Sequence, residues 1–508
     1  MKRFLIALAA VLAIASCGKD NPEEKGGKTT GTEESSNPYM YVNYFGRSCM
    51  GLYYLWTKEI SEGLSGWKSD DEPISKVKEI RYKQDGKDFD RWTMMTDDLS
   101  TFESSVAGVS KTYGYDLQLY YGDVEGKSIV AVITFVYKDS PADKAGLKRG
   151  DTILTVNGKK MTQATYAWVV NNELLNSESV SFTLSDGKTC QMTAVDMYED
   201  PVVTYKVLDV AGKKVGYLFY SSFTLRSCDR LIEACKHFKA EGAEELILDL
   251  RYNGGGYVFA QQVLASMLAP EANVRAGDVL ETTVYNEALA REVGDGATKL
   301  SFTHSITVEG EELTYNTEDA NIGLKKIYAI LDKGSASASE SLLTVLMPYM
   351  PITIVGQQSH GKFCTGIIYG AEDWFDDYKK AMATSTYTKG KKAVENWGLY
   401  VMIGRFADRF GNTPCMPDGF TPDVLVKDDP SDGHQLGDPE ETMLARVLSL
   451  ISSTESSGSG AAARQKRPSL EKVDYMIEKP NFGMHILTKD EFNQALPHSF
   501  FEVPSVQE

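Results

Sequence analysis

A serine in a loop of small residues is the first feature of this 508-residue chain that could do chemistry. Residues 333–340 read Lys-Gly-Ser-Ala-Ser-Ala-Ser-Glu and stand between an expected strand, 327–331, and an apolar helix that runs to about Met347. Ser337 in this loop would be unobstructed, and its oxygen would lie near a positive helix end that favours developing negative charge. The pattern indicates a nucleophile, although loops of small residues also serve as ordinary helix caps.

A turn of three consecutive glycines could supply the second part of such a site. Residues 249–256 read Asp-Leu-Arg-Tyr-Asn-Gly-Gly-Gly and join an expected strand, 245–250, to an expected helix, 257–268. The turn has neither the Gly-x-Gly-x-x-Gly spacing nor the Lys-Ser/Thr ending of a phosphate-binding loop. Consecutive glycines let backbone amides approach a reacting carbonyl, so the turn fits an oxyanion hole.

A third segment follows an expected strand, 352–355, and reads Gly-Gln-Gln-Ser-His-Gly-Lys at residues 356–362. Near residue 420 the chain adds Asp-Gly-Phe-Thr-Pro-Asp-Val, at 418–424. In this order the segments resemble those of the C-terminal processing peptidases, the tail-specific serine proteases of family S41, whose core is related in fold to crotonase. The resemblance covers about residues 113–430.

The resemblance implies a role for each part of the site. In that family the nucleophile is the middle serine and the general base is a lysine 25 positions later, which corresponds here to Ser337 and Lys362. It further implies an oxyanion hole made of backbone amides at Gly255, Gly256 and Ala338. A Ser-Lys pair is a known variant of the Ser-His-Asp arrangement.

The chemistry explains why the lysine would have to be buried. A lysine accepts the serine proton only when it is neutral, although its ordinary pKa is about 10.4. Lowering that pKa by about 3 units requires roughly 4 kcal/mol, which burial beside apolar walls can supply. We expect no metal and no other cofactor.

Three positions leave the details of this pair open. Glu340 matches the acid that follows the nucleophile in the family, but the helix dipole also stabilises an acid in a first turn. Gly366 stands where well-studied relatives have a glutamine that orients the lysine, so either another group orients Lys362 or the pair is weakened. His360 replaces a usual aromatic residue; it could act as the base because histidine titrates near neutrality, but an imidazole that fills the space of a ring is the simpler interpretation.

Residues 140–158 closely resemble the signature of bacterial PDZ domains. A short helix from Pro141 would stop at Gly146, and Asn157-Gly158 would form a hairpin turn. In PDZ domains an extended peptide adds a strand to the sheet edge, with its terminal carboxylate held by backbone amides. The residues expected at that loop, listed in order, are Tyr113, Gly114, Tyr115 and Asp116. They depart from the usual Gly-aliphatic-Gly form, and a PDZ domain that acts only as a spacer or lid is the alternative.

The first residues form a targeting segment. Lys2 and Arg3 precede an apolar run, 4–14, which is too short to span a bilayer comfortably. Residues 12–17 read Leu-Ala-Ile-Ala-Ser-Cys and resemble the lipobox of bacterial lipoproteins, which implies that Cys17 carries lipid; a plain signal peptide is the alternative. We therefore expect an extracytoplasmic protein, anchored to the bacterial cell envelope and in particular to an outer membrane.

The net charge and the cysteine spacing exclude some classes of binding partner and cofactor. The net charge of −18 argues against a nucleic-acid partner, since such surfaces are built to neutralise phosphates. The six cysteines after Cys17 form neither a tight framework nor a Cys-x-x-Cys pair, so we expect buried free thiols and no metal site.

These patterns predict a multidomain α/β protein with an N-terminal helical region, a β-rich PDZ domain and a crotonase/Clp-like α/β serine peptidase core. Helices are expected at 44–60 and 96–111 in the first of these. The expected units, in chain order, are a signal peptide, 1–16; a lipidated cysteine and flexible tether, 17–38; a helical domain, 39–112; the PDZ domain, 113–198; the peptidase core, 199–451; and a Ser/Gly linker with a C-terminal tail, 452–508.

The leading functional hypothesis is a lipid-anchored serine endopeptidase that hydrolyses peptide bonds in protein substrates. The PDZ domain would recruit these substrates, by binding their C-termini, or gate their access to the site. The alternative from another class is a catalytically weak scaffold that binds peptides through its PDZ domain. An acyl-CoA enzyme of related fold is disfavoured, because secretion removes the protein from CoA. The sequence names neither the substrate nor the oligomeric state.

Overall fold

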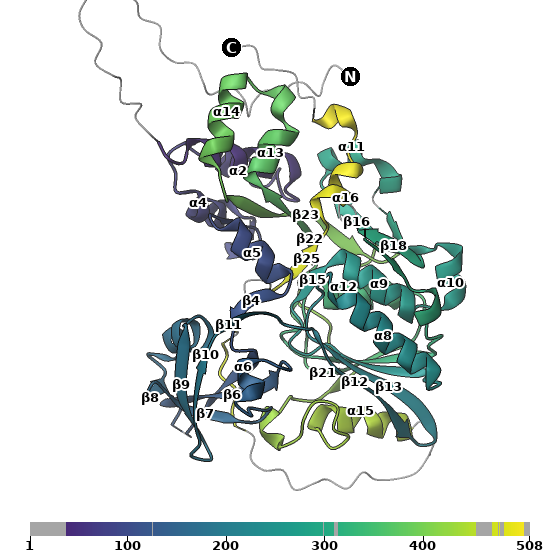
Figure 1. Ribbon diagram of the computed structural model, residues 1–508. Coiled ribbons are helices and arrows are strands. Elements are labelled where there is room, and N and C mark those ends of the chain that lie inside the picture. The colour runs from purple at the N-terminus through teal and green to yellow at the C-terminus, as the bar shows by residue number, and fades with distance from the viewer. Residues whose placement is uncertain are drawn as a thin grey trace, which may run out of the picture.

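The computed structural model describes residues 37–123, 125–297, 299–308, 313–453, 470–475, 477 and 482–501. The predicted signal peptide, Cys17 and nearly all of the tether lie outside these residues. Figure 1 shows three regions: the predicted PDZ domain at the lower left, the main sheet of the predicted peptidase region with its helices at the lower right, and a second sheet with the N-terminal helices above them.

The main sheet of the peptidase region has six strands in the order β12-β13-β14-β20-β21-β24. All neighbours are parallel except β12 and β13. The bounds of these strands are Val202–Val210, Lys213–Tyr220, Glu245–Asp249, Lys326–Leu331, Ile352–Gly356 and Val424–Leu425.

Both faces of the central strands β13, β14 and β20 are buried, which explains why these strands are nearly continuous apolar runs. Helices α8 (Ser227–Ala240), α9 (Val258–Leu268) and α12 (Ala338–Leu346) pack on one face. Helix α15 (Thr442–Ser453) packs on the other (Figure 1). The alternation of strand and helix predicted for this region is confirmed.

A second sheet runs in the order β15-β25-β22-β23-β16-β17, and β3 pairs with β23. Its strands, in that order and ending with β3, are Gly255–Tyr257, Met484–Ile486, Cys364–Gly370, Gly398–Ala407, Val279–Tyr285, Lys299–Ser301 and Met94–Thr96. Strand β25 comes from the C-terminal tail and lies between β15 and β22, where Figure 1 shows it in yellow at the centre of the molecule.

The N-terminal helices share their core with the peptidase. They are α2 (Met40–Tyr53), α3 (Ser61–Ser65), α4 (Pro73–Ile80) and α5 (Leu99–Val106), with a small hairpin of β1 (Lys83–Gln84) and β2 (Lys87–Asp88). Their buried side chains belong to the same hydrophobic cluster as those of α9 and α12. The two helices expected here are shorter than predicted: α2 ends at Tyr53, and Gly108, with φ of 81°, separates α5 from β4 (Val109–Thr112).

The PDZ domain is a six-stranded sheet in the order β10-β9-β7-β8-β6-β5 around its own hydrophobic cluster. The strands in chain order, β5 to β10, are Tyr115–Tyr121, Ser128–Val136, Thr152–Val156, Lys159–Thr162, Ser179–Leu184 and Thr189–Thr193. Short helices α6 (Pro141–Lys144) and α7 (Tyr166–Val169) complete it, followed by a π-helical turn, Val170–Leu175. Strand β11 (Val195–Tyr198) leaves the domain paired with β4.

A buried ion network fastens the PDZ domain to the peptidase region. Arg149, which follows α6, reaches Asp428 at 2.8 Å and Glu441 at 3.3 Å. Arg251 reaches the same two carboxylates at 2.7 and 2.8 Å and also pairs with Asp249 at 2.7 Å. Because every charge in this network has opposite charges as partners, its burial is tolerated.

The remaining elements lie mostly at the periphery. They are α10 (Glu271–Ala276), α11 (Glu287–Ala297), β18 (Ser305–Val308), β19 (Leu313–Asn316), α13 (Ala371–Asp377), α14 (Thr384–Ala393) and α16 (Lys489–Gln494), with short 3-10 turns at 318–320, 379–381, 430–432 and 498–500. No helix within the described residues is long and apolar enough to cross a membrane. The six described cysteines are all buried and unbridged, which agrees with the expectation of free thiols.

Candidate active site

Ser337 stands at the point where strand β20 turns into helix α12. Its backbone has φ of 62° and ψ of −111°, a conformation that non-glycine residues rarely adopt. The side chain is fully buried, and its Oγ has no hydrogen-bond partner among the described residues. A strained turn that holds an unpartnered hydroxyl at a helix N-terminus is suited to a nucleophile.

The glycine turn lies directly beside this serine. Gly255 has φ of 105°, and a Cβ added there would come within 2.8 Å of Ser337 Cβ and 2.2 Å of the Met484 oxygen. Only glycine fits at this position. The same added atom would lie 3.0 Å from the amide nitrogen of Ala338, the first residue of α12.

The three expected oxyanion donors differ in what they can do in this conformation. The Gly255 amide donates to Asn253 Oδ1 at 2.9 Å and is therefore already used. Gly256 pairs with His485 of β25 in the second sheet. The Ala338 amide belongs to the first turn of a helix, where N–H groups have no partner within the helix, and it lies next to Ser337. It is the best placed of the three to meet an oxyanion.

Glu340 binds the backbone of both predicted catalytic residues. Its Oε2 accepts from Ser337 N at 3.0 Å and from Lys362 N at 2.8 Å. Its Oε1 accepts from Gly361 N at 2.7 Å and from Ser359 Oγ at 2.6 Å. Burial raises the pKa of this carboxyl to about 7, while the four donors lower it. One side chain thus caps helix α12 and joins the backbone of Ser337 to that of Lys362.

Lys362 is fully buried, in a setting that favours its neutral form. Burial lowers the pKa of its ammonium group to about 8, although nearby Cys364, Asp90 and Glu340 raise it. Its Nζ donates to the Cys364 carbonyl at 2.6 Å. The indole ring of Trp92 lies 4.9 Å from the same nitrogen.

No hydrogen bond joins Lys362 Nζ to Ser337 Oγ in the part of the chain that the structure describes. The glutamine of well-studied relatives has no counterpart at Gly366, where an added Cβ would come 2.6 Å from Met402 Cε and from the Tyr400 ring. The Cys364 carbonyl, Trp92 and Tyr400, whose ring lies 5.7 Å from Nζ, orient the lysine instead.

His360 packs as an aromatic ring. Its imidazole meets Phe482 at 5.1 Å and Trp92 at 6.3 Å between ring centroids, both edge to face. Burial lowers its pKa to about 3, with Arg91 and Lys362 adding to the effect. Within the described residues its Nδ1 has no partner, so no hydrogen bond links it to Ser337. This geometry fits an imidazole that fills the space of an aromatic ring better than it fits a histidine that acts as the general base.

Two contributions to the site were not anticipated. Trp92 comes from the N-terminal region, and strand β25 comes from the C-terminal tail. On β25, His485 is fully buried, with Nε2 2.7 Å from Gln261 Oε1 and Nδ1 2.8 Å from Thr365 Oγ1. Because an amide oxygen only accepts, Nε2 carries the proton and the Thr365 hydroxyl donates to Nδ1. No local sequence signal marked either contribution.

The expected carboxylate-binding loop of the PDZ domain is tightly packed. Gly114 has φ of 78°, and an added Cβ would come 2.1 Å from Ser140 Cβ. The Tyr113 hydroxyl donates to the Ser177 carbonyl at 2.7 Å, and the Tyr115 hydroxyl donates to the Leu174 carbonyl at 2.6 Å. The fourth residue, Asp116, lines a cavity.

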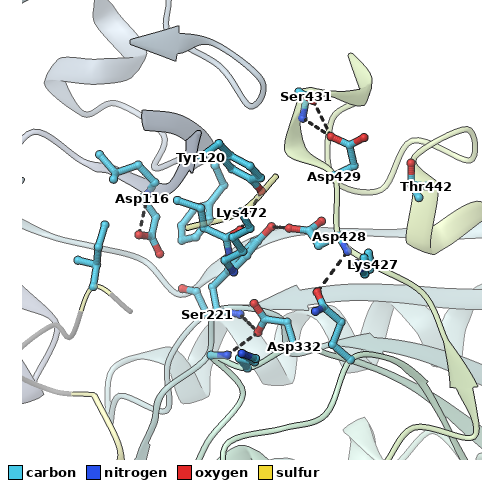
Figure 2. Close-up of a pocket in the computed structure, with 18 of the residues that line it drawn as sticks. Asp116, Tyr120, Ser221, Asp332, Lys427, Asp428, Asp429, Ser431, Thr442 and Lys472 are labelled. Carbon is cyan, nitrogen blue, oxygen red and sulfur yellow. Dashed lines mark hydrogen bonds between the residues drawn. The ribbon is translucent and has the colours of Figure 1, made fainter. Parts of the chain in front are cut away.

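That cavity, of about 1220 Å³, lies between the PDZ domain and the peptidase region. Asp116 and Tyr120 line it on the PDZ side, and Gly254 and Asp332 line it on the peptidase side (Figure 2). The tail segment 470–475 also borders it. The cavity therefore connects the PDZ edge with the turn that contacts Ser337. No cluster of three or more His, Cys, Asp or Glu side chains suited to a metal occurs within the described residues.

Fold and site together define a two-part protein, a PDZ domain followed by an α/β domain with a buried serine at a strand-to-helix turn. Comparison with known proteins names both parts. Residues 214–426 match the model of peptidase family S41, and residues 132–167 match a PDZ domain. The chain thus carries an S41 peptidase domain preceded by a PDZ domain.

Similar proteins include the carboxy-terminal processing protease CtpB of Bacillus subtilis, 25% identical over 52% of this chain and 48% of that protein. The chloroplastic C-terminal processing peptidase of Tetradesmus obliquus is 25% identical over 54% of this chain and 56% of that protein. The matches thus span about half the length of these curated relatives. A Bacteroides fragilis structure assigned to the S41 proteases has 21% identity and a TM-score of 0.61 over 81% of this chain and 97% of that one, which shows a shared fold.

Proposed function

We propose that this protein is a serine endopeptidase that cleaves peptide bonds in protein substrates with Ser337 as nucleophile and Lys362 as general base. The observation that carries the proposal is that one carboxylate oxygen, Glu340 Oε2, binds the backbone amides of both residues. The strained, unpartnered serine and the lysine of lowered pKa are therefore held at one place in the fold. The S41 match over this region supports the same chemistry.

The reaction follows from these positions. Neutral Lys362 takes the Ser337 hydroxyl proton while Oγ attacks the peptide carbonyl, after its Nζ has turned from the Cys364 carbonyl toward the serine. The Ala338 amide and the N-terminus of α12 stabilise the oxyanion, and one such donor is worth about 3 to 4 kcal/mol. The lysine then gives its proton to the departing amine. Water, deprotonated by the same lysine, releases the acyl group and restores the serine.

The proposal includes a location outside the cytoplasm and a lipid anchor at Cys17. It rests on the apolar run at 4–14 and on the lipobox-like residues 12–17. The PDZ domain would bring peptide segments of substrates toward the cavity that links it to the catalytic turn. Palmitate labelling of cells that express the wild type or Cys17→Ala tests the anchor, which predicts label on the wild type alone.

Cleavage of casein by residues 18–508 tests the activity. We expect Ser337→Ala and Lys362→Ala each to lower the rate by at least roughly a thousandfold, as in other serine proteases that lose a catalytic group. His360→Phe is the matched control, because it keeps a ring between Trp92 and Phe482, and it should retain most of the activity. Equal rates for wild type and Ser337→Ala would contradict the proposal and favour a peptide-binding scaffold.

A further inference from the structure

The C-terminal tail adds a strand to the PDZ domain. Val473 N donates to the Leu119 carbonyl at 2.9 Å, and Tyr121 N donates to the Glu471 carbonyl at 2.9 Å, so the segment pairs antiparallel with β5. Strand β5 is the last strand at one side of the PDZ sheet. Such an edge offers unpaired backbone groups that an extended peptide can satisfy.

Side chains of the segment fill the space between β5 and helix α7. Val473 is 5% exposed and belongs to the PDZ core cluster. The Tyr475 ring meets the ring of Tyr166 edge to face at 5.2 Å, and its hydroxyl accepts from Asn171 Nδ2 at 3.1 Å. On the opposite face Leu470 packs against a small separate cluster of the PDZ sheet. Backbone pairing and side-chain pockets are the two means by which an edge strand binds a peptide.

The same segment touches the loop that leads to the nucleophile. Lys472 lies between the PDZ residue Tyr120 and the carboxylate of Asp332 (Figure 2). Its neighbour Asp474 lies 3.5 Å from Lys333 Nζ. Asp332 and Lys333 open the turn that ends at Ser337. The segment therefore lies between the PDZ edge and the catalytic loop.

We propose that residues 470–475 are a built-in ligand of the PDZ groove, and that an extended apolar segment of a substrate protein competes with them for it. This inference rests on the proposed role of the PDZ domain in holding substrate peptides. The contact is small enough to exchange. It has two backbone hydrogen bonds to β5 and one buried side chain, Val473, while Glu471, Lys472 and Asp474 are exposed.

The attachment of the segment to the chain sets how strongly a free peptide must bind. A ligand tethered by a short linker acts at an effective concentration in the millimolar range. A free peptide of the same sequence should therefore bind weakly to the intact protein and at least roughly tenfold more tightly once the built-in segment is released.

A labelled peptide measures this competition. The protein is the full chain with Ser337→Ala, which prevents turnover, and the probe is a fluorescein-labelled peptide with the sequence of residues 469–477. Val473→Asp should release the segment, and the probe should then bind at least roughly tenfold more tightly than to the parent. Val195→Asp is the matched control, because this valine is 43% exposed and lies outside the segment, and it should leave probe binding unchanged. Equal binding by the parent and Val473→Asp would overturn the proposal.

A disulfide lock tests the opposite state and covers the case in which Val473→Asp perturbs folding. Tyr120 and Lys472 face each other as a non-hydrogen-bonded antiparallel pair, with Cα atoms about 4.5 Å apart, which suits a disulfide. In a Tyr120→Cys, Lys472→Cys chain the oxidised form should lose probe binding at least tenfold, and reduction should restore it. Equal binding by both forms would overturn the proposal.

The two proposals fail in different ways. Probe binding is measured without turnover, whereas the peptidase proposal is judged by casein cleavage with Ser337 intact. If the protein binds the probe as expected but does not cleave casein, the built-in ligand is supported and the peptidase proposal is contradicted. If the protein cleaves casein but release of the segment does not change probe binding, the peptidase proposal is supported and the built-in ligand is contradicted.

Discussion

The C-terminal segment forms two strand pairings of opposite character. At 484–486 it lies between β15 and β22, with a neighbour on each side, and all three residues are buried. At 471–473 it lies on the outer edge of β5, and only Val473 is buried. The difference indicates that one part of the tail belongs to the core of the second sheet, beside the candidate active site, whereas the other part is a contact that can exchange.

The surroundings of the two pairings support this distinction. Strand β25 is followed by α16, whose Phe492 is fully buried in the main hydrophobic cluster. Leu487 N also donates to the Gly366 carbonyl at 3.1 Å, next to the lysine strand. Removing β25 would leave a gap between the glycine turn and the strand that follows Lys362. Removing the segment at 471–473 would expose one side of the PDZ groove.

Substitution of a buried apolar residue by aspartate in each of the two pairings gives the largest expected difference in stability. Ile486→Asp would bury an unpaired charge in the second sheet at a side chain that is 2% exposed, and it should cost about 3 kcal/mol or more. Val473→Asp should cost less than about 1 kcal/mol, because the tail can leave the groove and carry the carboxylate into water. Because the Tm of the large unit that unfolds shifts by only about 1 °C per kcal/mol, Tm should fall by roughly 3 °C or more for the first and by less than about 1 °C for the second. A similar fall in Tm for both variants would show that the two pairings contribute equally to the stability of the fold.

A substitution at His485 tests the pairing of β25 with a smaller expected effect on stability. His485→Ala removes the partner of Gln261 Oε1 and of the Thr365 hydroxyl, both buried, and should destabilise the protein by about 1–3 kcal/mol. His434→Ala is the control, because that histidine pairs with Asp438 at the surface with 28% of its side chain exposed, and it should cost less than about 1 kcal/mol. Urea unfolding followed by tryptophan fluorescence measures both. Equal costs would show that β25 is held without this network.

The pH dependence of casein cleavage tests whether the lysine beside β25 acts as the base. Lys362 must be neutral, and its pKa is lowered to about 8 by burial, so activity should rise with pH through about 8. Its neutral fraction grows from roughly a tenth at pH 7 to roughly nine tenths at pH 9, so we expect about a tenfold rise.

His360→Phe again supplies the control for that profile. The pKa of His360 is lowered to about 3, so the imidazole stays neutral across the measured range and contributes no step. The midpoint should therefore stay near pH 8 in the variant. A midpoint between pH 6 and 7 that disappears in His360→Phe would instead assign the base to the histidine.

The local elements of the site were predictable because short motifs determine them. The strands expected at 245–250, 327–331 and 352–355 each differ from the observed β14, β20 and β21 by one residue at one end. The turns at Gly255 and Ser337 join the strands and helices expected around them. Apolar runs bounded by glycine and small polar residues carry that information within a few positions. The prediction was weaker at the N-terminus, where Gly108 ends a helix that the pattern extended to residue 111.

The sequence by itself determined the order and spacing of the motifs, including the 25 positions between Ser337 and Lys362, and the PDZ signature. Only the tertiary structure placed Trp92 over Lys362, bound the backbone amides of Ser337 and Lys362 to Glu340, and inserted β25 between β15 and β22. The reason is physical: a strand of three residues has too short a pattern to reveal its partners, and its place depends on shape and hydrogen bonding between segments more than 100 positions apart.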